Sequence, residues 1–212
     1  MEKKILLVGG GGHCYSVLDC LLSSGQYDKI GIVDPILEKG SVLGVPIIGT
    51  DEDLTRLFLE GWTDAFITIG SVGNTKLRKK IYEHLKNIGF HIPMVVDRSA
   101  VIARNTIIEQ GTFIGKQAVV NVGVQIGSCA IINTGAVIEH DCQLGDFVHI
   151  SPGAILCGQV SVDMDSHIGA GSMIKQQVKI GQNVLVGIGS VVLKDILDNS
   201  TAFGNPCKVV MK

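Results

Sequence analysis

The sequence predicts a two-part fold, in which an α/β domain of the Rossmann-like βαβ type is followed by an all-β domain wound as a parallel β-helix. Two observations predict it. Aliphatic residues recur at every sixth position through the C-terminal half, and strand-like and helix-like segments alternate around a glycine-rich loop in the N-terminal half. Pro93 lies between the two patterns, so we expect one domain at residues 1–94 and another at 95–212.

The six-residue period runs from Val96 to Val192, and all seventeen positions are aliphatic. Four residues after each of them comes a small or β-branched residue, from Ala100 to Ile196. Such a period fits neither a helix nor a flat strand, and it is typical of a β-helix in which three hexads form one coil of about eighteen residues. We expect the aliphatic series to point inward and the second series to fill the corners of the coils.

The N-terminal half alternates between short apolar runs and amphipathic segments. An apolar run leads into four glycines at 9–12, and the next run ends at Asp34. A nucleotide-binding βαβ unit has this same order of strand, glycine loop, helix, strand and acidic residue. The expected strands are Lys4–Val8, Ile30–Val33 and Ala65–Ile69, and the expected helices are His13–Ser24, Asp51–Leu59 and Thr75–Asn87.

The glycine loop allows backbone N–H groups to approach a phosphate at the start of the following helix. The third glycine of a dinucleotide fingerprint falls on Cys14, which disfavours NAD. A nucleoside diphosphate, with Asp34 on its base or ribose, fits better, and a plain tight turn without a ligand is the alternative. A second loop, 70–74, follows another expected strand, and ligands of parallel sheets bind at the carboxyl ends of strands.

Two histidines stand out in the repeat, and the hexad register places both. His140 comes two residues after an inward position, so it falls on a turn, whereas His149 directly precedes an inward position and points outward from a strand. Nine residues is half a coil, so the two side chains project from opposite sides of one chain and can meet only across a subunit interface. His167 stacks one coil above His149 on the same face.

An imidazole that titrates near neutrality can take a proton from an attacking amine or hydroxyl, which makes His140 a candidate general base. Either Glu139 or Asp141 can orient its ring, and Asp141 is preferred because Glu139 lies next to an inward residue. His149 is a candidate donor to a developing oxyanion. The alternatives are an exposed turn histidine at 140, a structural role for His167, and a zinc site shared by the three histidines across subunits.

The composition narrows the classes of partner. The chain of 212 residues is 46% hydrophobic and 18% charged, with a formal charge of −2, so it has no basic stripe for nucleic acid. Only a few apolar residues precede the glycine loop, so we expect neither a signal peptide nor a membrane segment. The six cysteines form no C-x-x-C pair, and we expect reduced thiols in a cytoplasmic protein without a permanently bound metal or cofactor.

The order of these parts resembles the NeuD/PglD-type bacterial sugar acyltransferases. The resemblance covers nearly the whole chain and rests on GGGGH, IGSVGNTKLRKKI, INTGAVIEHD, FVHISPGA and GNPCK, where Cys207 replaces the commoner alanine. It implies a left-handed coil, a homotrimer with active sites at subunit interfaces, and acetyl-CoA as co-substrate. It also implies transfer of acetyl to the 4-amino group of a UDP-4-amino-4,6-dideoxy-sugar, or to a hydroxyl of sialic acid. A non-catalytic oligomeric scaffold is the remaining alternative.

The resemblance also implies roles for individual residues. His140 matches the general base, Asp141 the acid behind it, and His149 the histidine that contacts the acetyl group. Residues expected to bind the nucleotide sugar are Gly11, Gly12, His13, Asp34, Gly70, Gly73, Asn74 and Asn133. Residues expected to bind acetyl-CoA besides His149 are Gly158 and, further along the same groove, Ala170, Gly187 and Ile188.

Overall fold

The computed structural model describes residues 2–36 and 40–211, and the chain divides by its contacts into two compact units. The first, here called the α/β unit, comprises Met1–Ser71 and Lys76–Val95. The second, here called the β-helix unit, comprises Val72–Thr75 and Val96–Lys212. The short Val72–Thr75 segment therefore groups with the β-helix, although it precedes the last helix of the α/β unit.

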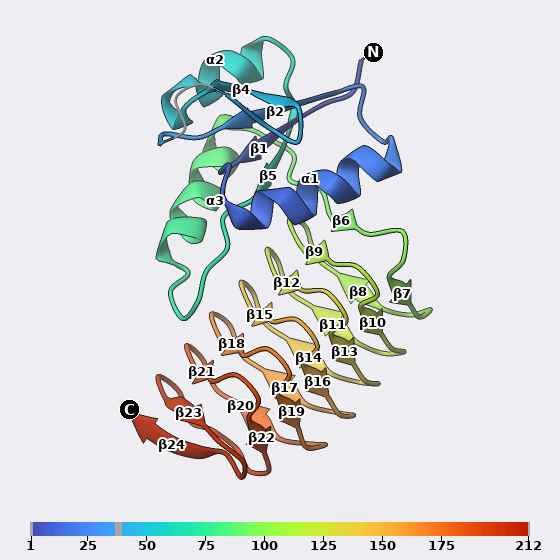
Figure 1. Ribbon diagram of the computed structural model, residues 1–212, viewed down its shortest axis with the longest axis vertical. Helices are drawn as coiled ribbons and strands as arrows, with labels where there is room; N and C mark the ends of the chain where they lie inside the picture. Colours follow the sequence, from blue (N-terminus) through green and yellow to red (C-terminus); the bar gives the residue numbers. More distant parts are fainter. Residues whose placement is uncertain (1, 37–39, 212) are drawn as a thin grey trace. The chain divides into compact units, whose positions relative to one another are not determined.

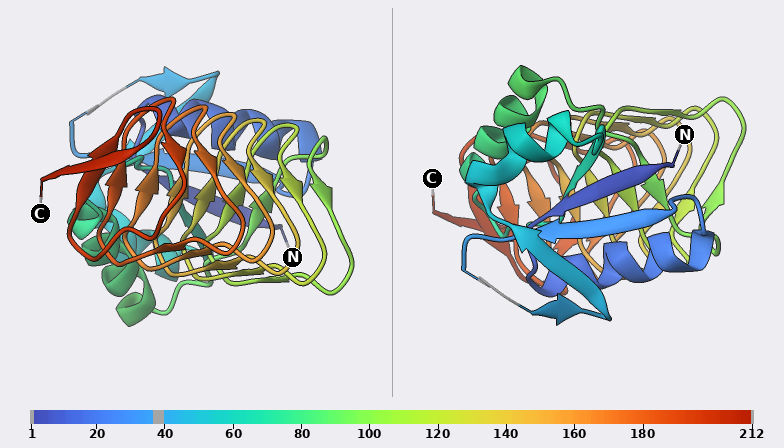
Figure 2. Two further views of the ribbon diagram at one scale, coloured as in Figure 1. Left: turned by 90° about the horizontal axis from the view of Figure 1, so that it is seen from below. Right: turned by 90° about the horizontal axis from the view of Figure 1, so that it is seen from above.

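The α/β unit is a five-stranded sheet in the order β3-β4-β2-β1-β5 with helices on both faces (Figures 1 and 2). The inner strand β1 carries Ile5, Leu6 and Leu7, all fully buried, because helices cover both faces of the sheet. Helix α1 lies on one face, and α2 and α3 lie on the other. The elements are β1 (Lys4–Val8), α1 (Gly12–Ser24), β2 (Lys29–Val33), β3 (Ser41–Val42), β4 (Val45–Gly49), a 3₁₀ turn (Asp51–Asp53), α2 (Leu54–Leu59), β5 (Asp64–Ile67) and α3 (Lys76–Ile88).

The expected strands and helices of this unit are present, and β3 and β4 are additional. β4 extends the parallel sheet because the Asp34 N–H donates to the carbonyl of Gly49, 3.0 Å away. Pro46 in the middle of this short strand hides it from sequence patterns, since proline is typical of strand edges. The expected helix at 51–59 is split, because Thr50 and Asp53 form a capping box around the initial 3₁₀ turn.

The β-helix unit is a parallel β-helix with three flat sides, as the six-residue period predicts, and its coil is left-handed, as the resemblance implies (Figure 1). Sheet 1 contains β6, β9, β12, β15, β18, β21, β23 and β24, sheet 2 contains β7, β10, β13, β16, β19 and β22, and sheet 3 contains β8, β11, β14, β17 and β20. The strands are β6 (Val95–Val96), β7 (Val101–Ile102), β8 (Ile107–Ile108), β9 (Phe113–Ile114), β10 (Val119–Val120), β11 (Gln125–Ile126), β12 (Ile131–Ile132), β13 (Val137–Ile138), β14 (Gln143–Leu144), β15 (His149–Ile150), β16 (Ile155–Leu156), β17 (Ser161–Val162), β18 (His167–Ile168), β19 (Met173–Ile174), β20 (Lys179–Ile180), β21 (Leu185–Val186), β22 (Val191–Val192), β23 (Thr201–Phe203) and β24 (Lys208–Met211).

Each strand pairs with the strand eighteen residues away, so inward residues stack in columns such as Ile132 on Ile150. The inward aliphatic residues and the small corner residues form one continuous core. Where the corner residue is polar, its hydroxyl bonds the main chain, as Thr112 Oγ1 does to the Gly127 carbonyl at 2.9 Å and Ser172 Oγ to the Gly187 carbonyl at 2.9 Å. These hydrogen bonds provide partners for hydroxyl groups that would otherwise be buried in the core without one.

The last coil is two residues shorter than the others. Ile180 pairs with Ile196 and Leu185 with Thr201, a spacing of sixteen residues in both cases. The expectation that Ile196 fills a corner is therefore wrong, because the shortening moves it to an inward strand position. The chain then ends in the antiparallel pair of β23 and β24, whose connection contains a cis peptide bond before Pro206.

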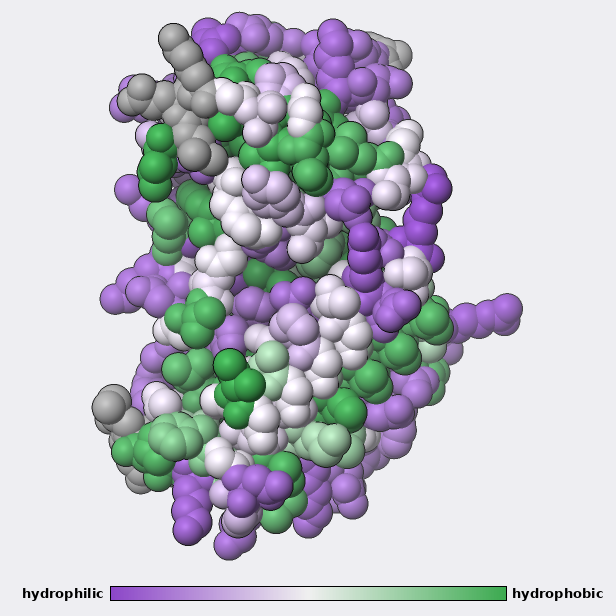
Figure 3. Space-filling view, viewed as in Figure 1, coloured by the Kyte–Doolittle hydropathy of each residue, from purple (hydrophilic) through white to green (hydrophobic). Residues whose placement is uncertain are grey.

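The outer faces of the three sheets differ in character. The outer row of sheet 3 is mainly polar, whereas that of sheet 2 is entirely apolar, and Figure 3 shows apolar atoms along the edge where β7 to β22 run. The outer row of sheet 2 consists of Val101, Val119, Val137, Ile155, Met173 and Val191, of which Val101 and Met173 are more than half exposed. Among the helices in the described ranges, none is long and apolar enough to cross a membrane.

Candidate active site

His140 and Asp141 form a hydrogen-bonded pair on an exposed turn. The turn joins β13 to β14, so the pair lies at the corner between sheets 2 and 3. His140 Nδ1 is 2.9 Å from Asp141 Oδ2, and the two side chains are 51% and 56% exposed. Asp141 has a left-handed backbone with φ of +59°, a conformation that aspartate tolerates better than most residues. The sequence register thus predicted the position of His140 on a turn correctly.

The neighbouring acid, Glu139, is engaged elsewhere, because its Oε2 accepts a hydrogen bond from Asn121 Nδ2 at 3.0 Å. Asp141 is therefore the carboxylate that orients the imidazole. An ionised carboxylate only accepts hydrogen bonds, so His140 Nδ1 carries the proton of the neutral ring. The lone pair of Nε2 then remains available to accept a proton from a reacting group.

Gly158 makes room for the His140 ring. A Cβ atom at this position would lie 2.6 Å from His140 Cε1 and 3.0 Å from Cδ2. The equivalent turn position of other coils carries Val122, Gln176 or Lys194, so the turn itself accepts a side chain. In the described chain, the Gly158 N–H donates to no backbone carbonyl, which leaves it available to a ligand at this corner.

The other residues expected to contact acetyl-CoA lie elsewhere. Ala170, Gly187 and Ile188 follow strands of sheet 1, so they lie at the corner between sheets 1 and 2, as does Asn133. Within one chain, the full width of sheet 2 separates these residues from His140 and Gly158. They can continue the groove of His140 and Gly158 only if that groove lies between two chains.

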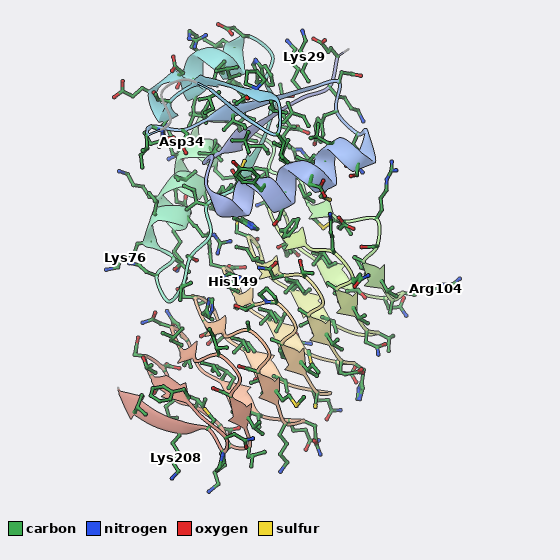
Figure 4. All side chains as sticks on the ribbon, viewed as in Figure 1. Lys29, Asp34, Lys76, Arg104, His149 and Lys208 are labelled. Carbon is green, nitrogen blue, oxygen red and sulfur yellow. The ribbon has the colours of Figure 1, made fainter. Side chains whose placement is uncertain are left out.

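His149 points outward from β15 in sheet 1, the side of the β-helix opposite the His140 corner (Figure 4). Its register partner in the next coil is His167, and their ring centroids are 4.5 Å apart at an interplanar angle of 72°. His167 is only 7% exposed, and its Nε2 is 3.0 Å from Ser151 Oγ. Within one chain, His149 therefore contacts His167 and not His140, as the register predicted.

In the α/β unit, Asp34 ties together two loops at the carboxyl edge of the sheet. Its two carboxylate oxygens accept hydrogen bonds from the N–H groups of Gly10, at 2.6 Å, and Ile36, at 2.8 Å. Asp34 is 8% exposed and lies at the end of β2 (Figure 4). Its carboxylate thus shapes the glycine loop directly, a role that the sequence pattern does not reveal.

The glycine loop opens onto the first turn of α1. A Cβ atom at Gly11 or Gly12 would meet no atom within 4 Å, and the first turn of α1 contains no acidic residue. Both features suit an anionic group at the helix N-terminus. Gly70 belongs to the same region, since a Cβ atom there would lie 3.5 Å from the Cβ of His13.

His13 is held in its neutral form. Burial and, to a lesser extent, the charge of Arg78 lower the pKa of His13 to about 4. Arg78 itself is 2% exposed, and its Nη1 is 3.5 Å from Ser71 Oγ. Nothing in the sequence signals this role of Arg78, since a basic residue in a helix is normally solvated. The effect of Arg78 on His13 depends on how α3 packs.

The loop expected at 70–74 divides between the two units. Gly73 and Asn74 belong to the β-helix unit, where a Cβ atom on Gly73 would lie 3.5 Å from Leu185 Cδ2. The adjacent Thr75 donates its hydroxyl to Asp165 Oδ1 at 2.5 Å, and both residues are buried. Gly73 therefore lies close to Leu185, which belongs to the row of outward residues that contains His167.

Within one chain, the structure gives the zinc alternative no support. In residues 2–36 and 40–211, no three histidine, cysteine, aspartate or glutamate side chains form a group that could hold a metal ion.

Comparison with known proteins identifies the family. Residues 4–85 match the model of the PglD N-terminal domain. The acetyltransferase domain of PglB from Neisseria gonorrhoeae FA1090 is 36% identical, with a TM-score of 0.92 over 98% of this chain and 100% of that one. The same domain in complex with acetyl coenzyme A is also 36% identical and has a TM-score of 0.90 over 99% of this chain and 100% of that one. PerB from Caulobacter crescentus, in complex with CoA and GDP-perosamine, is 34% identical, with a TM-score of 0.91 over 98% of this chain and 97% of that one.

These relatives extend over the α/β unit and the β-helix unit alike, and all are more than 30% identical to the chain. The chain therefore belongs to the NeuD/PglD-type family of hexapeptide-repeat, acetyl-CoA-dependent sugar acyltransferases, and it is a sugar acetyltransferase.

Proposed function

We propose that the protein transfers an acetyl group from acetyl-CoA to the 4-amino group of a UDP-4-amino-4,6-dideoxy-sugar, with His140 as general base. The observation that carries the proposal is the pair of His140 Nδ1 and Asp141 Oδ2 at 2.9 Å, which leaves Nε2 as a proton acceptor on an exposed corner. Relatives that bind acetyl-CoA, or CoA together with GDP-perosamine, support this class of donor and acceptor.

In this reaction the sugar nitrogen attacks the thioester carbonyl carbon, and His140 Nε2 accepts the proton that the amine loses. The new C–N bond forms as the C–S bond breaks, and the sulfur leaves as CoA thiolate, which takes up the proton. Asp141 stabilises the imidazolium that exists between these two proton transfers. His149 donates to the developing oxyanion, and the Gly158 N–H binds the pantetheine arm.

We further propose that the active sites form between the subunits of a homotrimer. Sheet 2 separates the corner of His140 and Gly158 from the corner of Ala170 and Ile188, so one groove can contain both sets only if they come from different chains. The apolar outer row of sheet 2 supports such an assembly, because an unbroken aliphatic face is typical of an obligate interface. The mass in solution, measured by light scattering, is expected to equal three chains, and a fully active monomer would contradict the arrangement.

The nucleotide sugar is proposed to bind at the carboxyl edge of the α/β sheet, with its diphosphate at the glycine loop. Gly11, Gly12 and His13 supply backbone and a neutral ring there, and Asp34 holds the loop. We place the reaction in the cytoplasm, since the six cysteines form no disulfide in the described chain and suit a reducing compartment.

The test is release of CoA thiol from acetyl-CoA with three acceptors: a UDP-4-amino-4,6-dideoxy-sugar, GDP-perosamine and sialic acid. Turnover with the UDP sugar is expected, and His140→Ala should lower kcat by about 10²–10⁴ without changing the melting temperature. Preference for GDP-perosamine would overturn the nucleotide but keep the reaction. Turnover with sialic acid alone would overturn N-acetylation, and a normal kcat in His140→Ala would remove His140 from its role.

A further inference from the structure

The outer row of sheet 1 changes from apolar residues to histidine in two successive coils. It runs through Phe113 and Ile131, which are 2% exposed, then His149 and His167, and returns to Leu185. A buried imidazole in an aliphatic row has a desolvation cost that a leucine does not have. Packing alone therefore does not explain why histidines occupy these two positions.

The two rings are coupled by geometry. Their centroids lie 4.5 Å apart at 72°, so one ring presents its edge to the face of the other, which is a favourable arrangement for aromatic rings. Ile131 and Leu185 flank the pair in the preceding and following coils. The His149 ring is thus limited in its rotation by His167 above it and by Ile131 below it.

Ser151 fixes the second ring. Its hydroxyl oxygen is 3.0 Å from His167 Nε2, and Ser151 is 5% exposed, so no bulk water competes for this contact. This hydrogen bond restrains the rotation of the His167 ring, and hence the edge or face that His167 offers to His149. Ser151, His167 and His149 therefore form a chain of contacts that runs from the buried side of the row to the half-buried imidazole.

We propose that His167 is a positioning residue for acetyl transfer, which holds the His149 ring in its working orientation and is itself fixed by Ser151. The inference rests on the proposed function, in which His149 contacts the acetyl group. It assigns to His167 and Ser151 a task that requires no contact with either substrate. Displacing a working group by 1 Å can cost about 10²-fold in rate, so loss of this support lowers kcat and leaves the affinity for acetyl-CoA unchanged.

The variants are Ser151→Ala, which removes the hydroxyl alone, and His167→Phe, which keeps a ring beside His149 but removes its nitrogens. Alanine fits at 151, because the substitution removes only the hydroxyl oxygen and keeps the Cβ atom that serine already has. The matched control is Ser172→Ala. Ser172 is a fully buried serine whose hydroxyl bonds the Gly187 carbonyl at 2.9 Å.

Two measurements on the full-length protein decide the matter. The first follows the ring ¹⁵N shifts of His149 and His167 by NMR, without substrate. Ser151→Ala is expected to shift both, and Ser172→Ala neither. An unchanged His149 signal in a folded Ser151→Ala protein would overturn the inference.

The second measurement is a double-mutant cycle on kcat. Ser151→Ala and His167→Phe should each lower kcat by about tenfold or more at constant KM for acetyl-CoA, and Ser151→Ala should have no further effect in a His149→Ala background. Additive losses in that cycle would also overturn the inference. If wild type acetylates no nucleotide amino sugar, the proposed function fails, and the NMR measurement still decides whether His167 and Ser151 position His149.

Discussion

Replacing Gly158 by alanine is the sharpest test of the His140 corner. The new methyl group would lie 2.6 Å from His140 Cε1 and 3.0 Å from Cδ2, whereas carbon atoms in contact normally lie about 3.5–4.0 Å apart. The ring must therefore move by roughly 1 Å. A displacement of that size is expected to lower kcat by about 10²-fold, or about 2.7 kcal/mol in the activation free energy.

The same substitution should hardly affect the free energy of unfolding. His140 is about half exposed, so its ring can swing into solvent, and what is lost is a surface pair worth about 0–1 kcal/mol. The Gly158 backbone is not left-handed, and Gln176 occupies the equivalent turn position one coil further along. The melting temperature should therefore fall by less than about 3 °C.

The assay is CoA thiol release under saturating acetyl-CoA and acceptor, with melting temperatures measured in parallel. Gly158→Ala is compared in the wild-type and His140→Ala backgrounds. The loss should vanish in the second background, because the methyl group then meets no ring. A kcat within threefold of wild type in Gly158→Ala, or an equal loss in both backgrounds, would refute the link between Gly158 and His140.

Two further outcomes concern the α/β unit and the 72–75 segment. The pKa of His13 is lowered to about 4 in the folded protein. Because the unfolded chain then binds the proton more readily, the free energy of unfolding should fall by up to about 3 kcal/mol as the pH drops from about 6.5 to 4. His13→Gln should reduce this fall, as measured by urea titrations at pH 7 and pH 4.5. Thr75→Val removes the hydroxyl that donates to the buried Asp165 carboxylate, and it should lower the free energy of unfolding by about 1–3 kcal/mol. The control is Thr106→Val, which removes a part-buried hydroxyl that donates to a main-chain carbonyl. Equal losses in the two variants would contradict a special role for the contact with Asp165.

The sequence was informative where structure follows a repeat. The six-residue period determined the inward series, the turn position of His140 and the opposite placement of His149, because every coil repeats one backbone geometry. It failed at Ile196, since a two-residue shortening breaks the period without changing residue character. Short elements such as β4 also escaped, because five residues containing Pro46 carry too little pattern.

Contacts between distant segments were beyond sequence reasoning. The hydrogen bond between Thr75 and Asp165 joins residues ninety positions apart, and neither residue type signals the other. The hydrogen bonds that Asp34 accepts from two loops likewise depend on how β1, β2 and β4 pair.

One turn position recurs in successive coils of the β-helix, where it is occupied by Val122, His140, Gly158, Gln176 and Lys194. Successive turn positions are one strand spacing apart, about 4.8 Å, and each can carry a different side chain. His140 occupies one of these positions, so moving a histidine to a neighbouring coil would shift it along the axis by a whole strand spacing. Inserting an eighteen-residue coil on the C-terminal side of His140 would add one such spacing while preserving the register of the core, so that lengths along this corner change by whole coils.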